Sequence, residues 1–461
     1  MRGSDYDGDM LPEPIRNAID VASNFVWGPW TMALLLGTGV FLTVRLRFVQ
    51  VARLREALRA MVPTRASGAG ALTPFQAFMT ALGASIGTGN IAGVATAIVS
   101  GGPGALFWIW MYGFFATAIK FCEAVLGIQY RKVHGERLSA GPMHYLKDGL
   151  GSPKLAWLYA LIAGVAALTT TPFTQPNSIA VVWQSQFNIP PLASGLVIAV
   201  LTWLVVIGGV KSIGRAAEKL APLKVGLYLA GGLIVILTHA AQLPTVFALI
   251  FREAFSLQAA GGGAAGVGMM VAMRYGIARG IYANEAGYGT AAVAYGTART
   301  EAPVQQGLQA VMEVFIVSCV TSTISALVIL ASGAWTSGLT STAVVAQAFN
   351  TAIPTVGGWV VAFCAFLFGY TTLIGWAYYG EQFLEYAVGL RVTVPYRWLY
   401  CILVVFGAMG KVETIWAWGD LMNGLQVFPN LVGLIGLSGV AASVLRRPGT
   451  EPQVSTAAPR A

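Results

Sequence analysis

Long apolar segments alternate with short polar segments along most of this chain. A helix needs about 20 mostly apolar residues to cross the hydrocarbon core of a bilayer. The pattern therefore predicts an all-α polytopic membrane protein with eleven spanning helices. These helices are expected to start near Asn24, Pro74, Gly104, Leu155, Leu192, Pro222, Gly266, Gly307, Gly357, Tyr396 and Trp416.

Glycines interrupt two of these apolar segments. The first reads GASIGTGNIAG over residues 83–93, and the second reads YGIARGIYANEAG over residues 275–287, with a break expected near Gly276. Each opens a run of five predicted spans, and broken helices at matching places of two halves are the best sequence pointer to a transporter's binding site. Unwound backbone at membrane depth is tolerated only where it lines a cavity or binds something. The two breaks therefore predict a solute-binding site.

This pattern divides the chain into five parts. We expect an extracytoplasmic N-terminal segment (1–23), an extra helix with a basic cytoplasmic loop (24–72), a first five-helix repeat (73–240), a second five-helix repeat (241–445) and a disordered cytoplasmic tail (446–461). The first helix of each repeat is the broken one.

The composition fits a membrane protein, because 56% of the residues are hydrophobic and only 10% are charged. The net charge of +9 is compatible with nucleic-acid binding, but the basic residues gather after every second predicted span. By the positive-inside rule, this places the N-terminus outside and the C-terminus in the cytoplasm, and it predicts no nucleic-acid partner. The predicted cytoplasmic loop between spans 5 and 6 contributes Lys211, Arg215, Lys219 and Lys224.

Several ionisable residues fall within predicted spans, where each charge costs roughly 2.5–3.5 kcal/mol at the helix centre and must pair or face water. Lys120 and Glu123 are spaced to pair with each other on one helix. Arg279 and Glu285 are candidates for an intracellular gate, although helix ends near the interface explain such charges equally well.

Polar residues in two further spans suggest which side chains face the site. In span 4, Gln175 and Asn177 are more costly to bury than a proline kink requires, so we expect them to face the cavity. In span 9, the hydroxyls of Thr371 and Thr372 suit a monovalent cation, and Trp376 is placed to wall the substrate pocket. Back-bonding of the hydroxyls to their own helix is the alternative.

A catalytic interpretation is rejected. Residues 83–87 match G-x-S-x-G, but this motif requires a strand–turn–helix context and a histidine partner. Here it lies in a predicted membrane helix, and His134, His144 and His239 are remote from it in the predicted topology.

In several of these segments the chain resembles the alanine/glycine:cation symporter family. The resemblance is carried by the runs 80–97, 101–108, 208–215, 278–287 and 375–381, within about residues 24–445. It implies sodium-coupled uptake of alanine, glycine or a similar small amino acid. It also implies the five-plus-five inverted-repeat fold of the leucine-transporter type, preceded by one extra helix.

The resemblance also implies site residues. Sodium would be held by the carbonyls of Gly83 and Ile86 with Thr371 and Thr372. The substrate would contact Ser85, Thr88, Gly89, Gln175, Asn177, Gly276 and Trp376. The chain departs from the family pattern at Thr169–Pro172, at Pro176 and at Val317, so a substrate other than alanine stays open.

These observations predict a sodium-coupled secondary active symporter, not an enzyme, that imports a small neutral amino acid by alternating access. A proton-coupled symporter on the same fold is the nearest alternative, and a channel or membrane enzyme is a more distant one. The expected partners are the amino acid, sodium and the lipid bilayer, with no other cofactor. We expect a functional monomer with several spans in the plasma (inner) membrane of a bacterium or archaeon.

Overall fold

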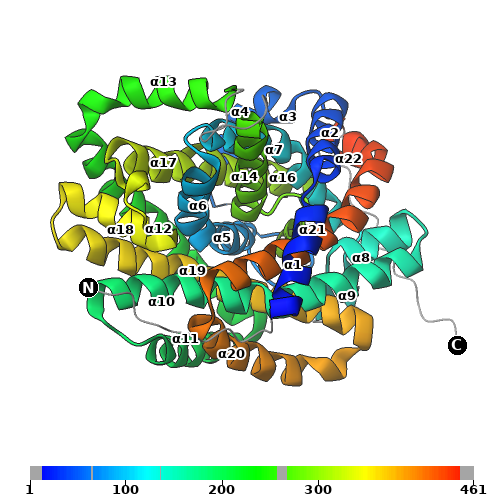
Figure 1. Ribbon diagram of the computed structural model, residues 1–461. Helices are drawn as coiled ribbons and strands as arrows, with labels where there is room; N and C mark the ends of the chain where they lie inside the picture. The colour runs from blue at the N-terminus through cyan, green and yellow to red at the C-terminus, as the bar shows by residue number, and fades with distance from the viewer. Residues whose placement is uncertain (1–12, 64–65, 135–136, 257–266, 447–461) are drawn as a thin grey trace, which may run out of the picture.

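The computed structural model describes residues 13–63, 66–134, 137–256 and 267–446 (Figure 1). The first part of the predicted extracytoplasmic segment and nearly all of the predicted disordered tail lie outside these residues. The described chain is almost entirely helical, and its one small sheet is the antiparallel pair β1 (Lys132–His134) and β2 (Arg137–Ser139).

Four helices precede the first glycine-broken segment: α1 (Glu13–Val26), α2 (Pro29–Arg45), α3 (Val49–Ala52) and α4 (Leu54–Ala60). Helices α1 and α2 together make one apolar stretch long enough to cross a membrane. The predicted extra helix near Asn24 therefore begins earlier than expected and is interrupted between Val26 and Pro29, because Pro29 lacks the N–H that would continue α1.

The first predicted repeat contains the small sheet and a series of helices. They are α5 (Pro74–Ser85), η1 (Thr88–Asn90), α6 (Ala92–Gly101), α7 (Ala105–Gln129), α8 (Pro142–His144), η2 (Tyr145–Gly149), α9 (Pro153–Thr169), α10 (Thr171–Phe187), α11 (Pro191–Val206) and α12 (Gly209–Thr238). Helix α5 starts sharply because Thr73 and Gln76 bond each other's backbone N–H groups with their side chains, both at 3.1 Å.

The second predicted repeat is also helical throughout its described residues. It contains η3 (Ala240–Gln242), α13 (Leu243–Ala254), α14 (Val267–Asn284), α15 (Thr290–Gly296), α16 (Pro303–Val314), η4 (Phe315–Thr321), α17 (Ser322–Ala331), η5 (Ala334–Thr336), α18 (Ser341–Ala352), α19 (Val356–Val388), η6 (Leu390–Val392), α20 (Thr393–Met409), α21 (Val412–Gly436) and α22 (Ser438–Arg446).

Among the described residues, seven helical stretches are long and apolar enough to cross a membrane, or nine if each of two bent pairs is one span. The 16-residue helix α11 is shorter, and α14 is not among the nine. Helix α14 carries Arg274 and Arg279 in the middle of its sequence, which lowers its hydropathy. The structure is thus that of a mostly helical protein with several candidate spans, and the eleven-span count stays a prediction.

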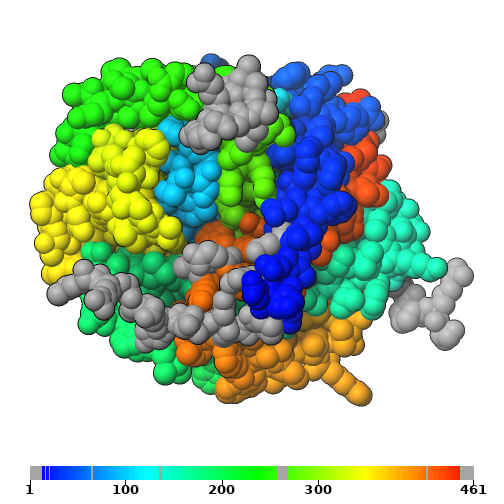
Figure 2. All heavy atoms as spheres, viewed as in Figure 1, coloured from blue at the N-terminus to red at the C-terminus, as the bar shows by residue number. Residues whose placement is uncertain are grey.

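Helices from both predicted repeats meet at the centre of the molecule. Helices α5, α6 and α14 lie there in Figure 1, and α6 contacts α14 while α5 contacts α12 and α19. In the space-filling view of the same face (Figure 2), α6 and α14 lie side by side and the beginning of α21 is visible below them. Helix α19 is buried along most of its length. Segments far apart in the sequence therefore surround one central region.

Candidate functional site

The first broken helix unwinds where its glycines predict. Helix α5 ends at Ser85, the chain passes through the short helix η1, and α6 continues at an angle of 56° to the first segment. Helix ends leave backbone groups without partners in the helix, and polar side chains satisfy some of them here. Asn90 donates to the Ser85 carbonyl at 3.2 Å, and Ser325 donates to the Asn90 carbonyl at 2.6 Å.

The second break lies nearer the C-terminus than predicted. Helix α14 runs without interruption through Gly276 and ends at Asn284, so the expected break at Gly276 is wrong. A Cβ at Gly276 would lie 2.5 Å from the Ala105 carbonyl oxygen. This glycine therefore lets α14 pack against α7, which is the small-residue packing role common in membrane helices.

The chain unwinds instead between Asn284 and Thr290. Glu285, Gly287 and Gly289 have φ angles of 58°, 103° and 85°, in the left-handed region that only glycine adopts freely. The buried Glu123 carboxylate holds this turn, because its Oε1 accepts the N–H groups of Gly287 at 2.8 Å and Gly289 at 3.1 Å. A carboxylate at these amides also complements the N-terminal end of α15.

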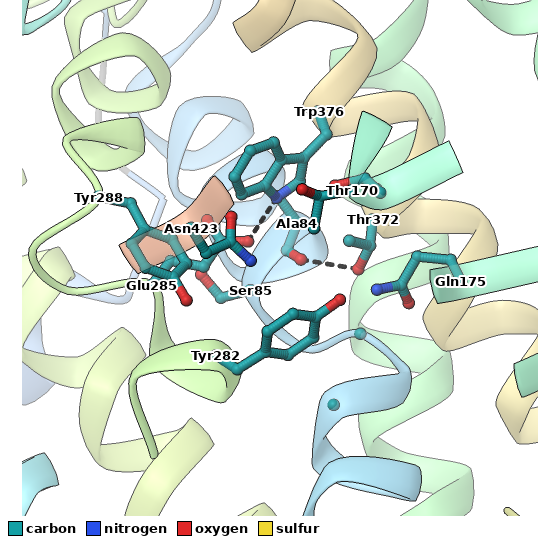
Figure 3. A pocket seen from close by; sticks show the side chains of 13 residues that line it. Ala84, Ser85, Thr170, Gln175, Tyr282, Glu285, Tyr288, Thr372, Trp376 and Asn423 are labelled. Carbon is teal, nitrogen blue, oxygen red and sulfur yellow. Dashed lines mark hydrogen bonds between the residues drawn. The ribbon is translucent and has the colours of Figure 1, made fainter. Parts of the chain in front are cut away.

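A cavity lies between the two breaks, with about 280 Å³ of space between atoms, its open side included. Figure 3 shows its lining side chains, which come from both predicted repeats: Glu285 and Gln175 flank the space, Trp376 lies on one wall and Tyr282 on another. The lining residues are Ala84, Ser85, Gly87, Gly89, Thr170, Thr171, Gln175, Tyr282, Glu285, Tyr288, Thr372, Trp376 and Asn423.

Hydrogen bonds fix the polar side chains at one side of this cavity. The Gln175 side-chain oxygen accepts from both the backbone N–H and the hydroxyl of Thr88, each at 2.9 Å. The Thr372 hydroxyl donates to the Ala84 carbonyl at 2.7 Å (Figure 3). These contacts join α10 and α19 to the unwound part of the first broken helix.

Glu285 supplies negative charge at the cavity. Its carboxylate accepts from the Trp376 indole N–H at 2.6 Å and from the Thr290 hydroxyl at 2.9 Å, and the side chain is buried (Figure 3). Neither of these donors carries a charge. Within the described residues, no cationic side chain lies at hydrogen-bond distance from this carboxylate, so it is available to bind a cationic group in the cavity. Charge-assisted hydrogen bonds of this kind are roughly twice as strong as neutral ones.

A buried ion pair lies behind the first break. Lys120 donates to Glu313 at 2.6 Å and to the Ser85 hydroxyl at 2.9 Å, and Ser85 also donates to Glu313. The Lys120 ammonium further reaches the Asn284 carbonyl at the end of α14. The expected pairing of Lys120 with Glu123 is therefore wrong, because Glu123 is taken up by the backbone of the second break.

An ion pair joins α14, the helix that carries Tyr282, to α21. Arg279 on α14 bonds Asp420 on α21 through both guanidinium nitrogens, one of them at 2.9 Å. The guanidinium also lies 4.9 Å from the ring of Trp416, whose ring centroid is 4.9 Å from that of Tyr282. Arg279 thus belongs to this cluster, whereas Glu285 lies at the cavity.

Three of the four predicted cation ligands meet at an ammonium group. Lys224 on α12 donates to the Gly83 carbonyl at 2.9 Å, to the Ile86 carbonyl at 2.5 Å and to the Thr371 hydroxyl at 2.5 Å. The expectation that Lys224 lies in a cytoplasmic loop is wrong, because it is completely buried within a 30-residue helix.

The predicted substrate residues are only partly gathered by the fold. Ser85, Gly89, Gln175 and Trp376 line the cavity, and Thr88 binds Gln175. Asn177 lies elsewhere: its amide donates to the carbonyls of Gly407 and Gly410 at the end of α20, at 3.3 and 2.7 Å.

Sequence reasoning missed several residues of the site: Glu285, Tyr282, Tyr288, Thr170, Thr171, Asn423 and Lys224. The sequence itself pointed to two of these residues. Glu285 follows Asn284 in the second glycine-rich run, and Lys224 follows Pro222 inside an apolar stretch. A charge placed within an apolar stretch is a functional candidate by default.

Comparison with known proteins gives a family match and several similar sequences. The model of the sodium:alanine symporter family matches residues 13–453. The sodium/alanine symporter AgcS of Methanococcus maripaludis is 38% identical over 92% of this chain and 95% of its own. An uncharacterized transporter of Haemophilus influenzae is 40% identical over 94% of this chain and 95% of its own. The probable sodium/glutamine symporter GlnT of Bacillus subtilis is 34% identical over 95% of this chain and 91% of its own.

Solved structures support the fold. The crystal structure of MhsT in complex with L-phenylalanine superposes with a TM-score of 0.59 at 12% identity, covering 83% of this chain and 98% of that one. A manganese transporter of Eremococcus coleocola gives 0.53 at 15% identity, covering 80% of this chain and 85% of that one. At these identities the likeness concerns the fold alone.

Proposed function

Because this chain belongs to the sodium:alanine symporter family, we propose that it imports alanine, glycine or a similarly small neutral amino acid by alternating access, driven by sodium. It is a membrane transport protein rather than an enzyme. The observation that carries the substrate proposal is the cavity between the two breaks, in which Glu285 lies on one side and the glycine-rich turn on the other.

This arrangement suits a zwitterion. Glu285 would accept the substrate ammonium group. The backbone at Gly87 and Gly89 would lie near the carboxylate, where unwound helix segments at matching places of two repeats form the substrate sites of such transporters. The rings of Trp376, Tyr282 and Tyr288 enclose the remaining space and would limit the substrate side chain to a small group. Of the amino acids that name its relatives, alanine fits these walls better than glutamine.

Residues that depart from the family pattern bear on selectivity. Thr170 and Thr171 belong to the stretch that differs, and both line the cavity. Their hydroxyls would add polar contacts to the substrate, so this stretch is where a preference for a slightly larger or hydroxylated amino acid would arise.

We also propose that the eleven-span, five-plus-five arrangement holds, with the N-terminus outside and the C-terminus in the cytoplasm. The two breaks at corresponding places of α5–η1–α6 and α14–α15 support it. In this topology the Arg279–Asp420 pair lies on the extracellular side of the cavity. Single cysteines would test it: an impermeant thiol reagent added outside should label exposed positions Gln242 and Ser337 but not Lys154 and Arg391.

The sodium gradient supplies adequate energy. One sodium ion moving down a tenfold gradient releases about 1.4 kcal/mol, and crossing 100 mV adds about 2.3 kcal/mol. Together these terms would concentrate a zwitterion on the order of 500-fold, since every 1.4 kcal/mol is a factor of ten.

Uptake of labelled alanine into proteoliposomes tests the proposal, with an inward sodium gradient against a potassium control. We expect accumulation only with sodium, and competition by excess glycine. Gln175→Ala should impair uptake, whereas Asn177→Ala, the same truncation of an amide outside the cavity, should impair it much less. Equal uptake with potassium would reject sodium coupling, and no uptake of any small amino acid would reject the substrate class.

A further inference from the structure

Lys224 lies where a coupling cation is expected. Its ammonium group has three N–H donors, and it meets three oxygen atoms: the carbonyls of Gly83 and Ile86 and the hydroxyl of Thr371, at 2.5–2.9 Å. These atoms belong to three of the four residues that the family resemblance implies as sodium ligands. The Lys224 side chain is completely buried, and α12, which carries it, packs against α5 and α19 (Figure 1).

The surroundings of Lys224 are those of a bound cation and not of a salt bridge. Within the described part of the chain, no carboxylate oxygen lies within 4.0 Å of its ammonium nitrogen. Lys120, the other fully buried lysine there, is paired with Glu313 at 2.6 Å. The charge of Lys224 must therefore be balanced by neutral dipoles, as the charge of sodium in an oxygen-lined site is.

Three groups supply these dipoles. The Gly83 and Ile86 carbonyls lie at the C-terminal end of α5, where the last carbonyls of a helix lack partners and the helix dipole is negative. The Thr371 hydroxyl donates to the Leu367 carbonyl at 3.0 Å, which leaves its lone pairs for the ammonium. The ring of Phe368 lies 5.3 Å from the nitrogen and adds a cation–π contact.

Thr372 does not share this role. Its hydroxyl donates to the Ala84 carbonyl at 2.7 Å and lines the substrate cavity. The three N–H donors of the Lys224 ammonium go to Gly83, Ile86 and Thr371 instead. With three oxygens occupied by N–H groups and the nitrogen at their centre, sodium has no place at this site while Lys224 is present.

We propose that Lys224 is a tethered cation that replaces the sodium ion at the end of α5, so that any sodium that drives transport binds at other oxygen atoms. This inference concerns the ion and does not depend on which amino acid is carried. The proposal also differs from what the family resemblance implies, because three of the residues expected to bind sodium bind a side chain of the protein itself.

Equilibrium binding of ²²Na⁺ to the purified full-length protein, without amino acid, tests this proposal. Lys224→Met removes the charge and ends one atom short of the lysine nitrogen, which leaves the three oxygens of Gly83, Ile86 and Thr371 facing the vacated position of the ammonium group. We expect this variant to bind one sodium ion more per molecule than the wild type. Adding Thr371→Val should abolish the extra site, whereas Lys154→Met, an exposed lysine, should add none.

Thr371→Val in the wild-type background gives an independent result. It should leave sodium affinity within about twofold of the wild type, because the hydroxyl binds Lys224 and not sodium. A tenfold or greater loss of sodium affinity in this variant would overturn the proposal, as would a folded Lys224→Met protein that gains no site. If Lys224→Met does not fold, the Thr371→Val result alone decides. Neither measurement uses alanine uptake, so failure of the proposed function would be seen separately.

Discussion

Arg279 and Asp420 form a two-point ion pair between α14 and α21, beside the contacting rings of Trp416 and Tyr282, which are tilted by 45° to each other. Both side chains are largely buried, with 5% and 15% of their surface exposed. Breaking such a pair leaves an unpartnered buried charge, which costs about 3–5 kcal/mol. Tyr282 also lines the cavity, so this pair holds together the two helices that cover one side of it.

We expect Asp420→Asn to open that side. In a protein whose cysteines are replaced by serine (Cys122, Cys319, Cys364 and Cys401), a cysteine introduced at Thr170 should react with an external thiol reagent at least tenfold faster when Asp420→Asn is added. Arg279→Lys should have an intermediate effect, because lysine cannot form the two-point contact. Unchanged reaction rates in both variants would show that the ion pair does not control access.

Glu285 should determine recognition of the substrate ammonium group. A hydrogen bond to a charged group contributes about 1.5–3 kcal/mol, so Glu285→Gln should raise the half-saturating alanine concentration roughly tenfold to a hundredfold. The measurement is alanine uptake at varied concentration in proteoliposomes. Glu56→Gln, an exposed carboxylate beside Arg53, is the control and should leave uptake unchanged.

Trp376 should act partly through Glu285, because its indole N–H donates to the carboxylate at 2.6 Å. We expect Trp376→Phe to weaken apparent alanine affinity about tenfold, which corresponds to about 1.4 kcal/mol. Combined with Glu285→Gln, the loss should be clearly smaller than the sum of the single effects, since contacting residues are not additive. Strict additivity in this double-mutant cycle would argue that the two residues act independently.

Lys120 and Glu313 should be coupled in stability. Lys120→Met leaves a buried carboxylate unpaired and should destabilise the protein by about 3–5 kcal/mol. The double variant with Glu313→Gln should regain most of this loss, because no uncompensated charge then remains. Thermal unfolding of the detergent-purified proteins measures the stability of the single and the double variant. A double variant as unstable as Lys120→Met alone would contradict the pairing.

Gly276 should matter for packing alone. Gly276→Ala places a methyl group against the Ala105 carbonyl, and such overpacking costs about 1–3 kcal/mol. We expect a lower unfolding temperature with unchanged alanine affinity in the protein that folds. Gly37→Ala, a helical glycine with open space around it, is the matched control and should be neutral. A loss of alanine affinity without a lower unfolding temperature would show that Gly276 contributes to the binding site.

Local patterns determined much of this protein. Apolar segment lengths predicted its helices, and the glycines at 87 and 89 predicted the first break, because a helix is lost where its own residues disfavour it. The second break was misplaced for an instructive reason. Gly276 and Gly287 look alike in sequence. In the structure, Gly276 allows close helix packing against Ala105, whereas Gly287 lies in the turn that Glu123 holds.

Tertiary structure decided how the polar residues are paired. The sequence showed that Lys120, Glu123, Lys224 and Glu285 are charges in or near apolar stretches, yet their partners lie far away along the chain. Lys120 is 193 positions from Glu313, and Lys224 is 141 from Gly83. A buried charge takes whichever oxygen atoms the packed helices bring to it. The sequence therefore determined that charges had to be satisfied, and only helix packing decided that an ammonium group would occupy the place expected for sodium.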